Sequence, residues 1–157
     1  MKHFITKIVS GGQTGADRAG LDFALAHNIP HGGWIPKGRK TEEGPLSDKY
    51  QLQEMPTGSY QIRTEKNVLD SDGTLIVSHG NLSGGSAMTR ELVKKHKKPW
   101  LHIDLDNVHQ AEAAKLLAEW IERHHLAVMN VAGARSSKDP KIYQATFDLL
   151  AAALLCS

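Results

Sequence analysis

The chain has 157 residues, enough to bury a core, and we expect a single domain over residues 1–157. Hydrophobic residues make up 40% and charged residues 23% of the chain, as in ordinary soluble globular proteins, and no apolar run is long enough to span a bilayer. A net charge of +2 is too small to indicate nucleic-acid binding by itself. The N-terminus has no signal-peptide core and the single cysteine, Cys156, cannot form an internal disulfide, so we expect a cytoplasmic protein.

Strand-like and helix-like stretches alternate along the chain. In chain order, apolar runs predict strands over 4–10, 31–35, 74–78, 99–104 and 126–131. Helical periodicity and end signals predict helices over 16–28, 64–70, 86–97, 108–125 and from Pro140 onward, with Asp139 as the last N-cap. Between them, residues 36–61 contain several glycines and prolines and little periodicity, which is typical of a functional or interface loop.

Three of the predicted helices have apolar residues at helical spacing, and we expect these residues to face the sheet. In the first helix they are Gly20, Leu21, Ala24 and Leu25. In the helix over 108–125 they are Ala113, Leu116, Leu117, Trp120 and Ile121, and in the last helix Ile142, Thr146, Leu149, Leu150 and Ala153.

The alternation of strands and helices predicts an α/β fold with a single Rossmann-like, doubly wound sheet. The sheet is expected to be mostly parallel, with helices on both faces. Ligands of such sheets bind at the carboxyl ends of the strands, near the point where the strand order reverses. We therefore expect the ligand-binding residues in the loops that follow the strands.

Three of those loops are rich in glycine: residues 10–15, 80–86 and 132–137. Each follows a predicted strand and leads into a predicted helix. Glycines allow a ligand to approach the backbone closely, and the N–H groups of a helix start suit an anion. We therefore expect the three loops to converge on one cleft for a phosphorylated or otherwise anionic ligand.

The first loop contains Gly11, Gly12, Thr14 and Gly15. It is neither the dinucleotide fingerprint G-x-G-x-x-G nor a Walker A loop. The glycines free the backbone and the Thr14 hydroxyl adds a donor, which suits an anion. A tight strand-to-helix turn explains the same residues about as well.

The second loop combines Gly84, Gly85, Ser86 and Thr89 at a helix start, and here anion binding is favoured over a plain turn. Glu91 follows in the same helix. Its carboxylate is either an acid/base or ribose ligand, or simply a solvated, helix-stabilising group, and the sequence leaves both open.

The third loop places Arg135, Ser136, Ser137 and the following Lys138 near Gly133, and arginine can bind phosphate with two hydrogen bonds. An exposed basic turn is the alternative, but the position after a strand favours function. In the irregular segment, Lys37 and Arg39 could close over an anion, although solvent-exposed basic residues are the plain alternative. The histidines have no spacing typical of a zinc site, so no metal site is predicted. Cys156 lies at a chain end and is a poor candidate for a catalytic nucleophile.

Four segments, residues 10–18, 33–39, 63–74 and 130–133, together resemble the putative molybdenum carrier family over nearly the whole chain. That family is similar to molybdenum cofactor carrier proteins and, more distantly, to the LOG-like (lysine-decarboxylase-like) Rossmann families. The resemblance implies a Rossmann-like fold, a homo-oligomer, and binding of a phosphorylated pterin cofactor or a nucleotide-like ligand. Molybdenum cofactor would then be cargo held through its phosphate.

The distant enzymes, cytokinin-activating phosphoribohydrolases, carry the motif P-G-G-x-G-T-x-x-E. Here the same spacing begins with Ser83, keeps Glu91, and has Ala87 and Met88 in place of Gly and Thr. We therefore favour a binding or carrier protein over a nucleoside-monophosphate phosphoribohydrolase using Glu91, or a nucleotide sensor. The expected ligand-binding residues are Gly11, Gly12, Gln13, Thr14, Gly15, Asp17, Lys37, Arg39, Gly84, Gly85, Ser86, Thr89, Gly133, Arg135 and Ser136.

A homo-oligomer is expected from the resemblance, the long segment over 36–61 and the leucines at the C-terminal end. The alternative is that the last helix packs on its own sheet. Neither a membrane nor a nucleic acid is expected as a partner.

Overall fold

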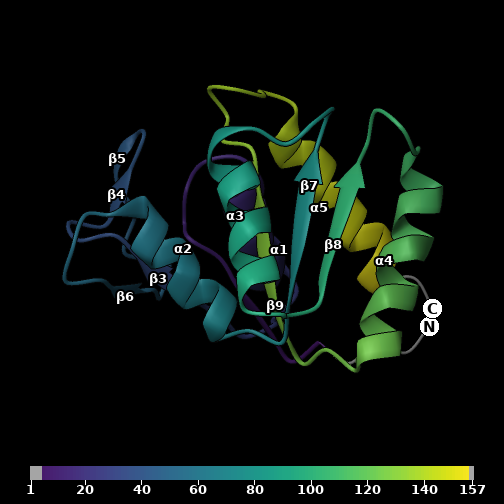
Figure 1. The fold of residues 1–157 in the computed structure, drawn as a ribbon, viewed down its shortest axis with the longest axis horizontal. Coiled ribbons are helices and arrows are strands. Elements are labelled where there is room, and N and C mark those ends of the chain that lie inside the picture. Colours follow the sequence, from purple (N-terminus) through teal and green to yellow (C-terminus); the bar gives the residue numbers. More distant parts are fainter. Residues whose placement is uncertain (1–4, 156–157) are drawn as a thin grey trace.

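A computed structural model describes residues 5–155 of the chain, and its centre is a five-stranded sheet (Figure 1). The strand order is β2-β1-β9-β7-β8, and every pairing in this sheet is parallel. The predicted α/β, Rossmann-like fold is thereby confirmed. The strands are β1 (Lys7–Val9), β2 (His31–Gly32), β7 (Gly73–Ser78), β8 (Trp100–Asp104) and β9 (Val128–Gly133).

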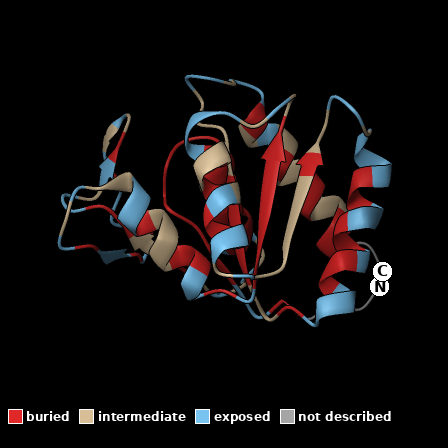
Figure 2. Cartoon of the chain, in the orientation of Figure 1, coloured by how far each residue is buried: buried red, intermediate tan, exposed pale blue. Residues whose placement is uncertain are grey.

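Helices cover both faces of the sheet. The side chains of β7 alternate between the two: Leu75 and Val77 belong to the main apolar cluster, and all six residues of the strand are buried (Figure 2). The main cluster is shared by α1, α4 and α5, and the smaller cluster on the other face by α2 and α3. These helices are α1 (Ala16–Ala26), α2 (Tyr60–Leu69), α3 (Gly84–Lys95), α4 (Gln110–His124) and α5 (Ile142–Leu154).

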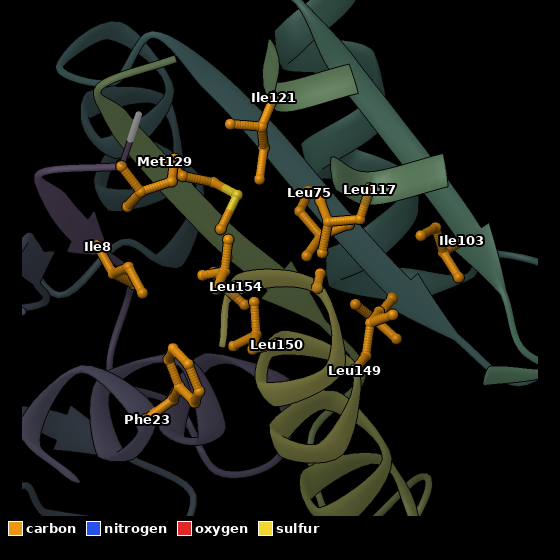
Figure 3. Packing of buried hydrophobic residues seen from close by; sticks show 14 of the residues in the cluster. Ile8, Phe23, Leu75, Ile103, Leu117, Ile121, Met129, Leu149, Leu150 and Leu154 are labelled. Atoms are coloured by element: carbon orange, nitrogen blue, oxygen red, sulfur yellow. The ribbon is translucent and has the colours of Figure 1, made fainter. Parts of the chain in front are cut away.

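The main core lies between the sheet and the α1–α4–α5 layer. Phe23, Leu149 and Leu150 point toward Met129 and Leu75 across this layer (Figure 3). All five side chains are fully buried. The apolar C-terminal helix thus packs on its own sheet; of the two leucines at its end, Leu154 is buried and Leu155 is 47% exposed.

The segment between β2 and α2 is less regular and forms a subdomain beside the sheet (Figure 1). It contains β3 (Trp34–Ile35) paired with β6 (Gln53–Glu54), and a short hairpin of β4 (Lys40–Thr41) and β5 (Gly44–Pro45). Ile35, Leu46, Tyr50 and Leu52 pack with Leu21 of α1 into a second apolar cluster. This cluster anchors the segment to the body of the domain.

The segment is also held by a shared carboxylate. The hydroxyl of Tyr50 donates to Asp22 of α1 at 2.5 Å, and the hydroxyl of Tyr143 of α5 donates to the other oxygen of the same side chain. Burial raises the pKa of both tyrosines, and the hydrogen bonds to Asp22 raise it further. Both phenols therefore stay protonated donors at neutral pH.

Two predicted inward positions are wrong. Leu25 is 39% exposed and Leu116 is 42% exposed, whereas Phe23, between the expected positions, is fully buried. The cause is that the apolar stripe of each helix is wider than the surface its neighbours cover. The contacts between α1, α5 and α4 decide which residues of the stripe are enclosed.

Element ends also differ from the prediction. The predicted strand over 31–35 is broken at Gly33, whose φ of 122° turns the chain from β2 into β3 of the neighbouring sheet. Helix α2 begins at Tyr60 because the Ser59 hydroxyl accepts the N–H of Ile62 at 3.2 Å. Asp139 lies before α5, which begins at Ile142; its carboxylate accepts the N–H of Lys141 at 3.0 Å.

Within residues 5–155, no helix is both long enough and apolar enough to cross a membrane.

The two adjacent leucines of α4 allow a matched test of the core. Leu117→Ala is expected to lower the free energy of unfolding by about 2–5 kcal/mol, because Leu117 is fully buried and its removal leaves a cavity. Leu116→Ala makes the same chemical change one residue away on the exposed side and is expected to cost roughly 0.5 kcal/mol or less. Urea denaturation of both variants measures the difference; equal losses would contradict the assigned helix face.

Candidate functional site

A cleft opens at the carboxyl ends of β1, β7 and β9. It encloses about 1000 Å³, counting the part open to solvent. Residues from all three glycine-rich loops line it, among them Gly11, Gly85 and Gly133. The convergence expected from the sequence is therefore present in the structure, at the edge where doubly wound sheets bind their ligands.

The floor of the cleft is built around Arg63 of α2. This side chain is buried, with 7% of the residue exposed, and its Nη1 donates to the carbonyl oxygen of Gly11 at 2.5 Å. A Cβ added at Gly11 would lie 2.3 Å from the same Nη1 atom, so only glycine allows the guanidinium to come this close. The loop after β1 and helix α2 are thereby locked together.

Asp17, in the first turn of α1, lies beside this arginine and also lines the cleft. Burial raises the pKa of its carboxyl to about 6, although Arg63, Arg18 and the backbone N–H groups of Gln13 and Gly11 act in the opposite direction. Near neutral pH the floor of the cleft thus combines a buried cation with a carboxyl group close to its titration point.

The start of α3 forms one wall of the cleft through Ser83, Gly85 and Ser86. The hydroxyl of Ser86 donates to the Ser83 carbonyl at 3.1 Å, and that of Thr89 donates to the Gly85 carbonyl at 2.9 Å. Among the described residues, no side chain caps the N–H groups of this first turn. These N–H groups therefore face the cleft region as donors at the positive end of the helix dipole.

A lysine lies next to the same helix end. A Cβ added at Gly84 would lie 2.6 Å from Nζ of Lys138, which directly follows the third loop and lines the cleft. A cation beside a helix N-terminus is electrostatically unfavourable without an intervening anion. Arg135 of the third loop and Asp139 beyond it also line the cleft, and the Asp139 carboxylate lies 2.7 Å from Nδ1 of His79, which follows β7.

Eight of the predicted ligand residues line the cleft, and the others lie outside its lining. The eight are Gly11, Gln13, Asp17, Gly85, Ser86, Thr89, Gly133 and Arg135. Gly12, Thr14, Gly15, Gly84 and Ser136 belong to the same loops but are not part of the wall.

Lys37 and Arg39 also lie outside the lining. The Arg39 guanidinium donates to the carbonyls of Leu46, Ser47 and Tyr50 at 3.1, 2.9 and 2.8 Å, which fastens its own segment together. Glu91 does not line the cleft either; its side chain is 64% exposed and its carboxylate pairs with Arg90 at 3.1 Å.

Lys138, which follows the third loop, lines the cleft as its place in the sequence suggested. Several other lining residues were not among the expected ligand residues: Tyr60, Arg63, Asn67, His79, Asn130 and Asp139. Three cationic side chains lie near the face of the Tyr60 ring: those of Lys40, Arg63 and Arg135, at 4.6, 5.4 and 5.9 Å from the ring centroid. Arg63 and Asn67 lie in residues 63–74, one of the four segments that resemble the putative molybdenum carrier family. That resemblance was the sequence feature that could have identified them as site residues.

Among residues 5–155, no group of three or more His, Cys, Asp or Glu side chains is placed to hold a metal ion. Cys156 lies outside the described residues.

With this geometry in place, the chain was compared with known proteins. Residues 8–154 match the sequence model of the circularly permutated YpsA SLOG family. The chain belongs to this family. A crystal structure from Syntrophus aciditrophicus SB, described as a putative molybdenum carrier protein, is similar to this SLOG-family chain with a TM-score of 0.97 and 62% sequence identity, covering 98% of each chain. A comparison with curated proteins gives no match.

The raised pKa of Asp17 predicts a specific pH dependence of stability. Because the folded-state pKa of about 6 exceeds the ordinary value of 3.8, the stabilisation linked to Asp17 is complete below pH 3.8 and is lost as the pH rises through about 6. Asp17→Asn should therefore gain stability relative to the wild type between about pH 4 and pH 7.

Urea unfolding at several pH values measures this difference. Asp48→Asn, in which the replaced side chain is fully exposed, is the matched control and should show a nearly constant difference from the wild type. A difference between Asp17→Asn and the wild type that does not change with pH would contradict the buried, weakly acidic carboxyl.

Proposed function

We propose that this SLOG-family protein binds and carries a small phosphorylated ligand, either molybdenum cofactor or a related nucleotide-like molecule, in the cleft. The observation that carries the proposal is the Lys138 ammonium beside the N-terminus of α3, because two positive groups at one wall favour an anion between them. Arg135 and Arg63 add two further cations to the lining.

The rest of the lining suits the organic part of such a ligand. Tyr60 offers an aromatic face. Asn130 is buried within the central strand β9, lines the cleft, and donates its amide N–H to the Thr74 hydroxyl at 3.2 Å. That bond leaves the Asn130 carbonyl oxygen as an acceptor for a ring N–H of a pterin or a base. In this proposal the protein holds the cargo through its phosphate and ring, and supplies no ligand to molybdenum.

The protein from Syntrophus aciditrophicus supports a carrier role, since it is described as a putative molybdenum carrier protein and is 62% identical over 98% of both chains. We propose both a pterin and a nucleotide as ligand classes, because the cleft lining suits either ring. The homo-oligomer and the cytoplasmic location stay predictions; light scattering over a wide concentration range tests the former.

Hydrolysis by Glu91 has less support in the structure, because its side chain points to solvent and pairs with Arg90. Incubation with nucleoside monophosphates, followed by chromatography for free base, separates the two functions. Rapid turnover abolished by Glu91→Gln would replace the carrier proposal with an enzyme. Native mass spectrometry of protein purified from its own host would identify a retained pterin or nucleotide.

The cleft can be blocked without disturbing the fold at Gly85. Its φ is not positive, and an added Cβ meets no atom within 4 Å, so Gly85→Val should fold normally and place its side chain in the cleft. We expect affinity for a nucleoside monophosphate or molybdenum cofactor to fall about tenfold or more, since an overpacked contact costs on the order of 1–3 kcal/mol. Titration calorimetry measures the loss.

Gly58→Val is the matched control, because Gly58 also has open space around it and lies outside the cleft lining. Gly12 is unsuitable for this test: its φ is 76° and an added Cβ would lie 3.1 Å from three apolar side chains. Unchanged affinity in a folded Gly85→Val protein would count against the cleft as the binding site.

A further inference from the structure

The tip of the β4–β5 hairpin places one carboxylate in a pocket of donors. Glu42 receives hydrogen bonds from the Thr14 hydroxyl, from the Ser137 N–H at 3.2 Å and from the Ser137 hydroxyl at 2.6 Å. The Arg135 guanidinium lies 3.9 Å from the same carboxylate. Thr14 belongs to the first glycine-rich loop and is 28 residues from Glu42 along the chain, and Ser137 belongs to the third loop and is 95 residues from it.

Hydrogen-bond donors and a guanidinium around one carboxylate are the groups that form an anion-binding site, and here the Glu42 carboxylate occupies it. The carboxylate is enclosed, with 16% of its side chain exposed. Burial opposes its ionisation, yet the hydrogen bonds from Ser137 and Thr14 and the charge of Arg135 outweigh burial and hold the pKa of Glu42 below its usual value. At neutral pH the occupant is therefore a carboxylate anion.

The subsite adjoins the cleft through two shared residues. Gln13 and Arg135 both line the cleft, and both contact the hairpin tip: the Gln13 side-chain oxygen accepts the Glu42 N–H at 2.9 Å. Arg135 therefore belongs both to the cleft lining and to the groups around the Glu42 carboxylate, whereas Thr14 and Ser137 lie outside the lining.

The hairpin tip can leave this position without unpacking the core. The tip is joined to the body of the domain by the hydrogen bonds of Glu42, and the Lys40 ammonium lies 4.6 Å from the centroid of the Tyr60 ring. The apolar anchors of the segment, Leu46, Tyr50 and Leu52, lie after the hairpin. Gly38 and Gly44, both at positive φ with no atom within 4 Å of an added Cβ, flank the tip on either side.

We propose that Thr14, Arg135 and Ser137 form a second anion subsite of the cleft, and that Glu42 fills it as an internal stand-in until an anionic group of the ligand displaces it. This inference rests on the proposed function and narrows the ligand class to molecules with two anionic groups, such as a diphosphate. When the ligand displaces Glu42, the hairpin of residues 40–45 is released. Until then Glu42 competes with the ligand, so the apparent affinity for the ligand falls in proportion to the fraction of time that Glu42 occupies the subsite.

Inorganic pyrophosphate is the probe for this subsite. Glu42→Gln removes the charge of the internal competitor, and we expect its affinity for pyrophosphate to rise about tenfold over wild type. Glu43→Gln removes the same charge from the neighbouring exposed residue. Because solvent and salt screen an exposed charge, this variant should change the affinity for pyrophosphate by less than about twofold. Thr14→Val removes a donor of the subsite and should weaken binding instead.

A second measurement uses the wild-type protein alone. Pyrophosphate should speed amide hydrogen exchange in residues 40–45 while slowing it in the three glycine-rich loops. Equal affinity of Glu42→Gln and Glu43→Gln, or slower exchange in residues 40–45 on binding, would overturn the subsite while leaving anion binding in the cleft intact. If pyrophosphate binds none of these proteins, both the subsite and the proposed function are overturned.

Discussion

The contact between the buried Arg63 guanidinium and the Gly11 carbonyl is the interaction on which the cleft depends. It fixes α2, which belongs to one face of the sheet, to the loop that begins α1 on the other. A buried guanidinium needs acceptors and compensating charge, and Gly11 and Asp17 supply them. The cation is therefore preorganised at the floor of the cleft and does not have to be ordered by a ligand.

In our proposal the cleft combines this buried, preorganised floor with a hairpin that a ligand can displace. The glycine-rich loops are positioned by strands β1, β7 and β9 and by the helices that follow them. The β4–β5 hairpin is held at its tip by the polar contacts of Glu42 and, behind the tip, by the apolar cluster around Leu21. The proposed carrier function would need this combination, because tight preorganisation alone would slow the release of a ligand.

Strand–loop–helix order and glycine content predicted the fold and the meeting of the three loops, because both follow from local patterns and from the geometry of parallel sheets. The burial of Arg63 and the role of Glu42 could not be predicted this way, since each depends on where a distant segment crosses the sheet edge. Leu116 and Leu117 show the same limit within one helix: both fit the apolar period, and only packing against α5 distinguishes them.

The position of β9 has a consequence for biosynthesis. This strand lies between β1 and β7, yet its first residue is Val128, near the end of the chain. A ribosome-bound chain that stops before it has the pairs β1–β2 and β7–β8 with no strand to join them. The cleft can be assembled only after residues 128–133 have been synthesised, so the site of the proposed ligand cannot form on a shorter nascent chain.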